Sequence, residues 1–194
     1  MSRKAFIAFV VFSILSLNSG AQEKEKRFGI ELSSGPSVFS GKLTGATLNP
    51  GYGFEGTLQY RIIQYTDVYL GWGWNYFGNG SIFAGNNAVF KDNGYVLGFQ
   101  FVHPVMEPVS LFVRAGAVYN HIEVDGESGI LLYDFGRGFG FQFATGIGVG
   151  LSSDWNLNFG IKLNSIIKKT VIEDISSNLN LNLLLVQISI IKRF

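Results

Sequence analysis

The chain has 194 residues, of which 15 are Lys or Arg and 14 are Asp or Glu, so its formal net charge is +1. Charged residues make up 15% of the chain, whereas a typical soluble domain has about 25%. Aromatic residues reach the same 15%, and there are 25 glycines. So little charge cannot cover the surface of an ordinary water-soluble domain, and the absence of cysteine excludes disulfides, thiolate metal sites and a lipid-modified cysteine.

The N-terminus has the layout of a secretory signal peptide. A basic start precedes the apolar run from Ala5 to Leu17, and small residues up to Ala21 form a cleavage site. A membrane-spanning helix is the alternative, but the run has 13 residues and a spanning helix needs roughly 20. We therefore predict a signal peptide over residues 1–21 and one mature domain over residues 22–194.

Beyond this leader the dominant pattern is the alternation of apolar with small or polar residues, the period of strands with two unlike faces. Five segments show it cleanly: 52–60, 68–76, 95–101, 139–151 and 157–163. Less regular segments begin at Phe28, at Leu111 and near Leu179. We predict about eight strands, each near the 9–11 residues that cross a bilayer. The apolar parity slips at Leu183 and Leu184, which predicts a β-bulge there.

The connections between these strands alternate in length. Three are short: 61–67, 103–108 and 152–154. Four are long and polar: 40–50, 78–93, 123–137 and 165–177. Short turns on one side and long loops on the other are typical of outer-membrane barrels.

The less apolar face decides between a membrane barrel and a soluble lipocalin-like barrel. In a soluble barrel this face would meet water and be rich in charge, but here it consists mainly of Gly, Asn, Gln, Ala and Thr. Small side chains suit a narrow interior. The apolar face carries aromatic residues near strand ends, as interfacial girdles do: Tyr52, Tyr60, Trp72, Trp74, Tyr76, Tyr95, Tyr119 and Trp155. We predict an all-β fold, a closed antiparallel eight-stranded transmembrane β-barrel with up-and-down topology.

The last nine residues resemble the C-terminal assembly signal of outer-membrane proteins, an aromatic final residue on a strand with alternating apolar positions. The matching residues are Phe194, Ile190, Ile188 and Val186. Lys192 departs from the pattern, which usually has an apolar residue at that position. The mature chain is similar to small barrels of the OmpA/OmpX type. Because nothing follows Phe194 in the sequence, we expect it to lack the peptidoglycan-binding domain of full OmpA-like proteins. The resemblance implies an outer-membrane location and recognition by the barrel-assembly machinery.

Four charges fall on inward-facing positions of the predicted strands: Glu31, Glu55, Arg114 and Lys162. Buried charges persist when they are paired and hydrogen-bonded. Because two acids and two bases balance, we predict one interior layer of salt bridges that blocks the lumen. A gated ion path is the alternative.

Few residues suggest catalysis or metal binding. His121 lies beside Glu123, with Ser128 in the following loop, which leaves open an acyl-transfer site at the outer rim. We expect a solvated histidine instead, no enzyme activity, no cofactor and no metal. Four cations in or near the outer loops are candidates for contacts with lipopolysaccharide phosphates: Lys91, Arg137, Lys168 and Lys169.

Function is expected at the outer loops. The apolar series of the sixth strand continues backward through Phe135, Tyr133 and Leu131, so we predict a hairpin over 119–139 that rises above the membrane as paired strands. The predicted role is structural or adhesive, with membrane lipid and an extracellular protein as partners and no nucleic acid. A lipid A-modifying enzyme and a narrow channel for small solutes are the alternatives.

Overall fold

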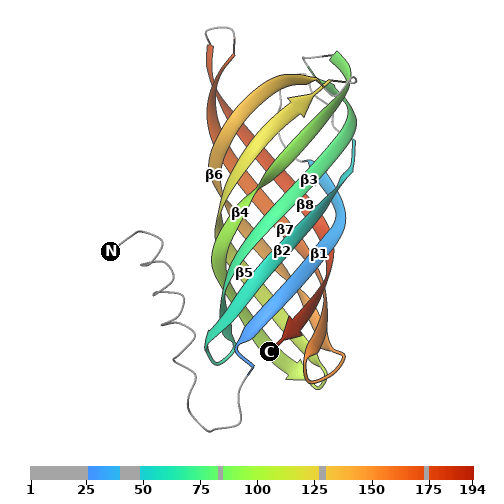
Figure 1. Cartoon of the computed structure of the whole chain (residues 1–194), viewed down its shortest axis with the longest axis vertical. Helices are drawn as coiled ribbons and strands as arrows, with labels where there is room; N and C mark the ends of the chain where they lie inside the picture. Colours follow the sequence, from blue (N-terminus) through green and yellow to red (C-terminus); the bar gives the residue numbers. More distant parts are fainter. Residues whose placement is uncertain (1–25, 40–48, 83–84, 127–129, 173–174) are drawn as a thin grey trace, which may run out of the picture.

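The computed structural model is a ring of eight antiparallel strands, in which each strand pairs with the next and β1 pairs with β8 (Figure 1). It describes residues 26–39, 49–82, 85–126, 130–172 and 175–194. The strands are β1 (Phe28–Phe39), β2 (Gly51–Ile63), β3 (Thr66–Ile82), β4 (Gly85–Met106), β5 (Val109–Asp125), β6 (Leu131–Gly150), β7 (Trp155–Ile172) and β8 (Ile175–Arg193). The eight strands and the closed up-and-down topology agree with the sequence prediction.

Two of the predictions fall wholly or partly on residues that the structure does not describe. The predicted signal peptide, 1–21, and residues 40–48 of the long loop predicted over 40–50 lie outside the described residues. None of the described segments is a helix long and apolar enough to cross a bilayer.

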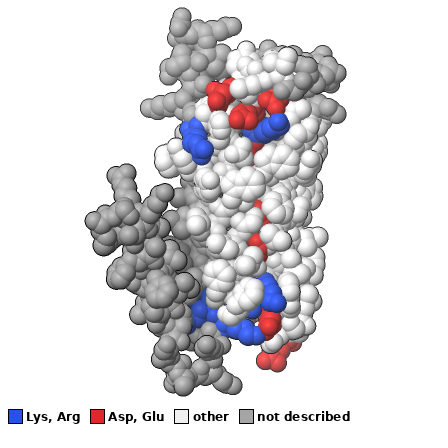
Figure 2. All heavy atoms as spheres, in the orientation of Figure 1, with Lys and Arg blue, Asp and Glu red and all other residues white. Residues whose placement is uncertain are grey.

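The alternation of the sequence appears as alternating exposure along the strands. Apolar residues of the predicted outer face are exposed on every strand, and the polar or small residues between them are mostly buried inside. Figure 2 shows one side of the ring, on which most charges lie near the two ends and only a few acidic atoms are visible between them. The outward band of large apolar side chains includes Leu58, Leu70, Leu97, Phe99, Phe141, Ile161 and Ile188.

Several strands are longer than predicted, because most of the three long connections after β3, β5 and β7 is paired strand and not loop. β3 and β4 pair up to Ile82 and Gly85, and β7 and β8 pair up to Ile172 and Ile175. The prediction of loops over 78–93 and 165–177 was therefore wrong. The ring has a turn end, where β1 begins, β8 ends and short turns connect the strands, and a hairpin end, where the β7–β8 hairpin rises above the neighbouring strands (Figure 1).

Glycines on the inner face make room for the large side chains that cross the lumen. Tyr69 is buried, and a Cβ atom at Gly98 or Gly116 would lie 2.8 or 2.6 Å from its hydroxyl oxygen. Those distances are shorter than any normal carbon–oxygen contact. The phenol ring therefore spans the interior only because β4 and β5 have no side chain at these positions.

The half of the interior near the hairpin end is apolar, which the sequence reading did not anticipate. We call the following buried side chains the apolar plug: Phe77, Phe90, Ile122, Val124, Phe135, Ile166, Leu181, Leu183 and Leu185. Val96 and Val118 belong to the same apolar cluster but lie nearer the turn end, among polar side chains. The residues of the plug come from six strands, and Phe39 of β1 packs against the cluster. The register of β7 with β8 is continuous through Leu183 and Leu184. The predicted bulge there was wrong, because Leu183 and Leu185 simply face inward.

A real bulge lies on β6 instead, at Gly136. This glycine has a φ of 65°, and the pairing of β5 with β6 shifts register beside it. A glycine in the left-handed region is the usual device of such bulges. The bulge turns Phe135 into the lumen, where the ring is 7% exposed. The predicted paired hairpin over 119–139 is confirmed by pairing of β5 with β6 up to Asp125 and Leu131, but the outward placement of Phe135 was wrong.

Candidate functional site

The four predicted interior charges lie inside the ring as two ion pairs. Arg114 of β5 binds Glu31 of β1, and the Lys162 Nζ of β7 lies 2.9 Å from the Glu55 Oε2 of β2. All four are at least 95% buried. The strands that hold each pair are separated around the ring, so each pair crosses the lumen.

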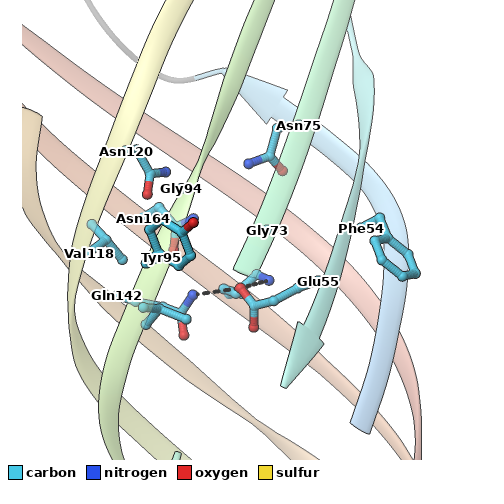
Figure 3. Close-up of a pocket in the computed structure, with 12 residues that line it drawn as sticks. Phe54, Glu55, Gly73, Asn75, Gly94, Tyr95, Val118, Asn120, Gln142 and Asn164 are labelled. Carbon is cyan, nitrogen blue, oxygen red and sulfur yellow. Dashed lines mark hydrogen bonds and ion pairs between the residues drawn. The ribbon is translucent and has the colours of Figure 1, made fainter. Parts of the chain in front are cut away.

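Neutral polar side chains connect the two pairs. Gln142 donates to Glu55 at 3.0 Å and accepts from the Tyr69 hydroxyl at 3.1 Å. The Arg114 guanidinium lies 5.3 Å from the centre of the Tyr69 ring, so it also makes a cation–π contact. Figure 3 shows how Gln142 reaches Glu55 below Asn75 and Asn120. The cavity among these side chains measures about 10 Å³, which leaves space for one water molecule at most.

The network extends toward both ends through charges that the sequence reading missed. At the turn end, Asp67 of β3 accepts from Arg193 of β8 at 2.6 Å, from Arg61 at 3.2 Å and from Gln100 at 3.3 Å. Arg61 and Asp67 had been assigned to a turn, but β2 and β3 pair down to Ile63 and the residue that opens β3. A turn of two residues leaves these side chains on strands, facing inward.

At the other end of the network, Asp92 of β4 is buried among amides. Asn75 donates to Asp92 at 2.9 Å, and the Asn120 amide donates at 2.8 and 3.0 Å. Asp92 had been assigned to a loop. The next inward position of β4 toward the hairpin end is Phe90 of the apolar plug, so on this strand the polar network ends at Asp92.

A network of this kind supports a closed lumen. Its eight charged groups comprise four acids and four bases: Glu31, Glu55, Asp67, Asp92, Arg61, Arg114, Lys162 and Arg193. The surplus base lies at the turn end, where two arginines share Asp67, and the surplus acid is Asp92. Beyond Asp92 the apolar plug offers an ion no polar ligand.

The outer rim carries a second group of charges on β4, β5 and β6. Lys91 lies beyond Tyr95 toward the hairpin end, and its Nζ is 2.5 Å from the Asp125 carboxylate. This hydrogen bond raises the pKa of Lys91 above its ordinary value, so the side chain stays charged at neutral pH. On β6, the exposed Arg137 places its guanidinium 5.4 Å from the centre of the Tyr119 ring.

His121 lies in the same region and contacts two acids. Its Nε2 is 2.7 Å from the Asp134 Oδ1, and its Nδ1 is 3.5 Å from the Glu123 Oε1. Asp134 also accepts from the Gly136 amide at 2.6 Å, so the histidine is fixed to the bulge of β6. Ser128 and the side chains of Lys168 and Lys169 lie outside the described residues. Within the described residues, no group of three or more His, Asp or Glu side chains could hold a metal ion.

The residues of the predicted assembly signal all face outward. Phe194, Ile190, Ile188 and Val186 are between 40% and 54% exposed. The Lys192 Nζ, which departs from the resemblance, lies 5.0 Å from the centre of the Trp155 ring and 5.3 Å from that of Phe194. The ammonium group of the lysine thus lies over two aromatic rings at the turn end.

Comparison with known proteins agrees with this architecture. Residues 7–189 match the family described as outer membrane protein beta-barrel domain. The chain belongs to this family. No curated protein matches the chain.

Solved structures show the same fold at low sequence identity. Neisserial surface protein A has a TM-score of 0.67 and 16% identity, over 86% of this chain and 97% of the other. OprG of Pseudomonas aeruginosa has a TM-score of 0.56 and 12% identity, over 87% and 97%. E. coli outer membrane protein W has a TM-score of 0.54 and 14% identity, over 89% and 100%. At such identities the likeness concerns the fold alone.

Proposed function

We propose that the chain is exported by a signal peptide cleaved after Ala21, spans the outer membrane, and acts as a closed barrel whose outer hairpins bind another protein. The observation that carries this proposal is the contrast between its two parts. The lumen is filled by ion pairs and the apolar plug, whereas paired strands continue to the ends of three hairpins. A structural or adhesive role fits that contrast better than transport does.

The β7–β8 hairpin offers the clearest binding edge. β6 and β7 pair up to Phe139 and Ile167, and β1 and β8 pair up to Phe39 and Leu183. Above these positions, within the described residues, β7 and β8 pair only with each other, up to Ile172 and Ile175. Unpaired amide and carbonyl groups along a strand edge can accept an extended segment of another protein.

Two deletions test this role in cells that display the protein. One variant lacks residues 168–180 of the β7–β8 hairpin, and the other lacks residues 125–134 of the β5–β6 hairpin. We expect the first deletion to reduce adherence to cultured epithelial cells and cell–cell aggregation, with the barrel still assembled. A variant with a two-residue insertion in the turn after Ile63 is the control. Unchanged adherence in both deletions would contradict the proposal.

Conductance in planar bilayers tests the closed lumen separately. We expect no stable single-channel steps from the purified protein, because an ion would have to cross the apolar plug. Replacement of Leu183 and Phe90 by alanine should open part of that path. Steady conductance of the unmodified protein would favour the narrow channel over the adhesive barrel.

Lipid contacts are proposed for the outer rim. Arg137 is exposed and its guanidinium lies over the Tyr119 ring, and Lys91 stays charged beside Asp125. Lipopolysaccharide phosphates could bind both, and Lys168 and Lys169 are the other candidates. The barrel-assembly machinery is the proposed partner of the strand that ends at Phe194. Arg137→Gln should weaken binding of purified lipopolysaccharide, and unaltered binding would remove this residue from the site.

A further inference from the structure

An open cavity lies at the turn end of the barrel, apart from the hairpins to which we assign the proposed function. It has a volume of about 470 Å³, within the range of about 300–1,000 Å³ typical of small-molecule sites. Arg61 and Arg193 line one part of it, and the turn between β4 and β5 lines another. The two parts differ in chemistry.

The first part is cationic. Arg61 and Arg193 both bind Asp67, and in the described part of the chain no other carboxylate lies within ion-pair distance of either guanidinium. Two positive charges therefore share one negative charge. Asp67 is fully buried and already accepts from three side chains. Arg61 uses only its Nε in this contact, so its terminal nitrogens are available to donate to a ligand.

The charge of the wider network does not cancel this surplus locally. The next two acids toward the lumen, Glu31 and Glu55, are bound to Arg114 and Lys162. The remaining unbalanced acid, Asp92, lies at the far end of the network. Glu107 also lines the cavity, but it is exposed on the turn, where water screens its charge. The floor of the cavity therefore favours an anion.

The second part of the cavity is apolar. The β4–β5 turn and the strand ends beside it contribute six apolar residues to the lining, which are Val102, Pro104, Val105, Met106, Pro108 and Val109. Met106 is 66% exposed and Val105 is 51% exposed. Turns that meet water are usually polar, so this wall is suited to an alkyl chain.

We infer that this cavity binds an anionic amphiphile, with a carboxylate or phosphate head at Arg61 and a single alkyl chain along the β4–β5 turn. The head accepts charge-assisted hydrogen bonds from the terminal nitrogens of Arg61. Desolvation of the chain against Val105 and Met106 adds the apolar part of the binding free energy. The same chemistry is available from a free fatty acid or from a lipid headgroup of the adjacent leaflet.

The test is photocrosslinking of the full chain in phosphatidylcholine nanodiscs with a diazirine-bearing dodecanoate. We expect cross-links at residues 105–109 and competition by dodecanoate and dodecyl phosphate, with little competition by dodecanol. Arg61→Gln should weaken capture about tenfold, since one charged hydrogen-bonding group is lost. Arg27→Gln, a matched change at an exposed arginine of the turn end that does not line the cavity, should leave capture unchanged. Met106→Ser tests the apolar wall and should also weaken capture.

Further arms separate the sources and check the fold. Phosphatidylglycerol added to the discs should lower capture if a lipid headgroup is the occupant, and should not change it if the occupant is a free amphiphile. Heat-modifiable gel migration checks that Arg61→Gln is folded, as we expect because Asp67 keeps Arg193 and Gln100. Equal capture by Arg61→Gln, equal competition by dodecanol, or cross-links only on outward residues such as Phe99 would overturn the inference.

Discussion

Replacement of Arg114 by methionine should destabilise the barrel more than any other single change in its lumen. The guanidinium is 1% exposed, binds Glu31 and Gln100, and lies over the rings of Tyr69 and Phe112. Without it, Glu31 keeps one hydrogen bond, from the Gln59 amide at 2.5 Å, and is 0% exposed. Breaking a buried pair by removing one partner costs about 3–5 kcal/mol. Methionine fills similar space, so little of the loss comes from a cavity.

The expected loss of stability depends on how many hydrogen bonds the stranded carboxylate keeps. Lys162→Met also strands a carboxylate, but Glu55 keeps Gln142 at 3.0 Å and Thr57 at 3.5 Å. Lys162→Met should therefore lower the free energy of unfolding by less than Arg114→Met does. The double variant Arg114→Met/Glu31→Gln removes both charges and should recover most of the stability.

The assay is equilibrium urea unfolding of barrels inserted into phosphatidylcholine vesicles, followed by gel migration. A loss of about 3–5 kcal/mol shifts the folding equilibrium by a factor between about one hundred and several thousand. A loss below about 1 kcal/mol for Arg114→Met, or a double variant no more stable than the single one, would refute the pairing of Arg114 with Glu31.

The remaining predictions concern the edges of the barrel. Deletion of Phe194, which is 54% exposed, should leave the folded barrel about as stable in vesicles but reduce its amount in the outer membrane; normal membrane levels would remove the assembly role. Amide exchange should be slow from Leu131 to Phe135, because these residues belong to a paired hairpin, and rapid exchange throughout would contradict the pairing. Gly136→Val should cost about 1–2 kcal/mol of stability, because valine is strained at a φ of 65°. It should speed amide exchange in this hairpin but not at Leu97, and equal acceleration at both places would show that the effect of the bulge is not local.

The sequence predicted the ring of strands because the two faces of each strand meet different surroundings. At Phe99 and Phe141 the outward face is large and apolar, and at Gly98 and Gly140 the inward face is small. That contrast is a property of single residues and can be read without knowing which strand pairs with which. It also placed Glu31 and Arg114 on the inward face.

The contrast disappears in the half of the barrel near the hairpin end, and there the sequence reading failed. On β8, Leu183 and Leu185 face the apolar plug while Leu184 faces outward. With apolar residues on both faces, alternation no longer distinguishes inside from outside, and a regular strand resembled a bulged one. On β6 a bulged strand resembled a regular one. Its apolar residues continue at odd-numbered positions across Gly136, so the sequence pattern did not indicate the register shift there.

The inner charges at the ends of the network were missed for a different reason. Arg61 and Asp67 flank a turn of uncertain length in the sequence, and only the observed pairing shows that both remain on strands. Arg193 lies in the C-terminal segment, where the assembly pattern concerns the outward residues and says nothing about the inward ones. Strand register is a long-range property, and it decides which side chains of different strands meet across the lumen.

The polar network and the apolar plug follow one another along the barrel axis, and this order bears on where the barrel can bind other molecules. An ion entering from the turn end meets Arg61 and Arg193, then two closed ion pairs, and reaches Asp92 with the apolar plug beyond it. Desolvating an ion without polar ligands costs far more than the local surplus of one charge can offset. Among the described residues, the cavity at the turn end is therefore separated from the hairpin end by the ion pairs and the apolar plug. This order fits the proposed function, in which contacts with another protein are made at the hairpin end, where β7 and β8 pair with each other beyond their neighbouring strands.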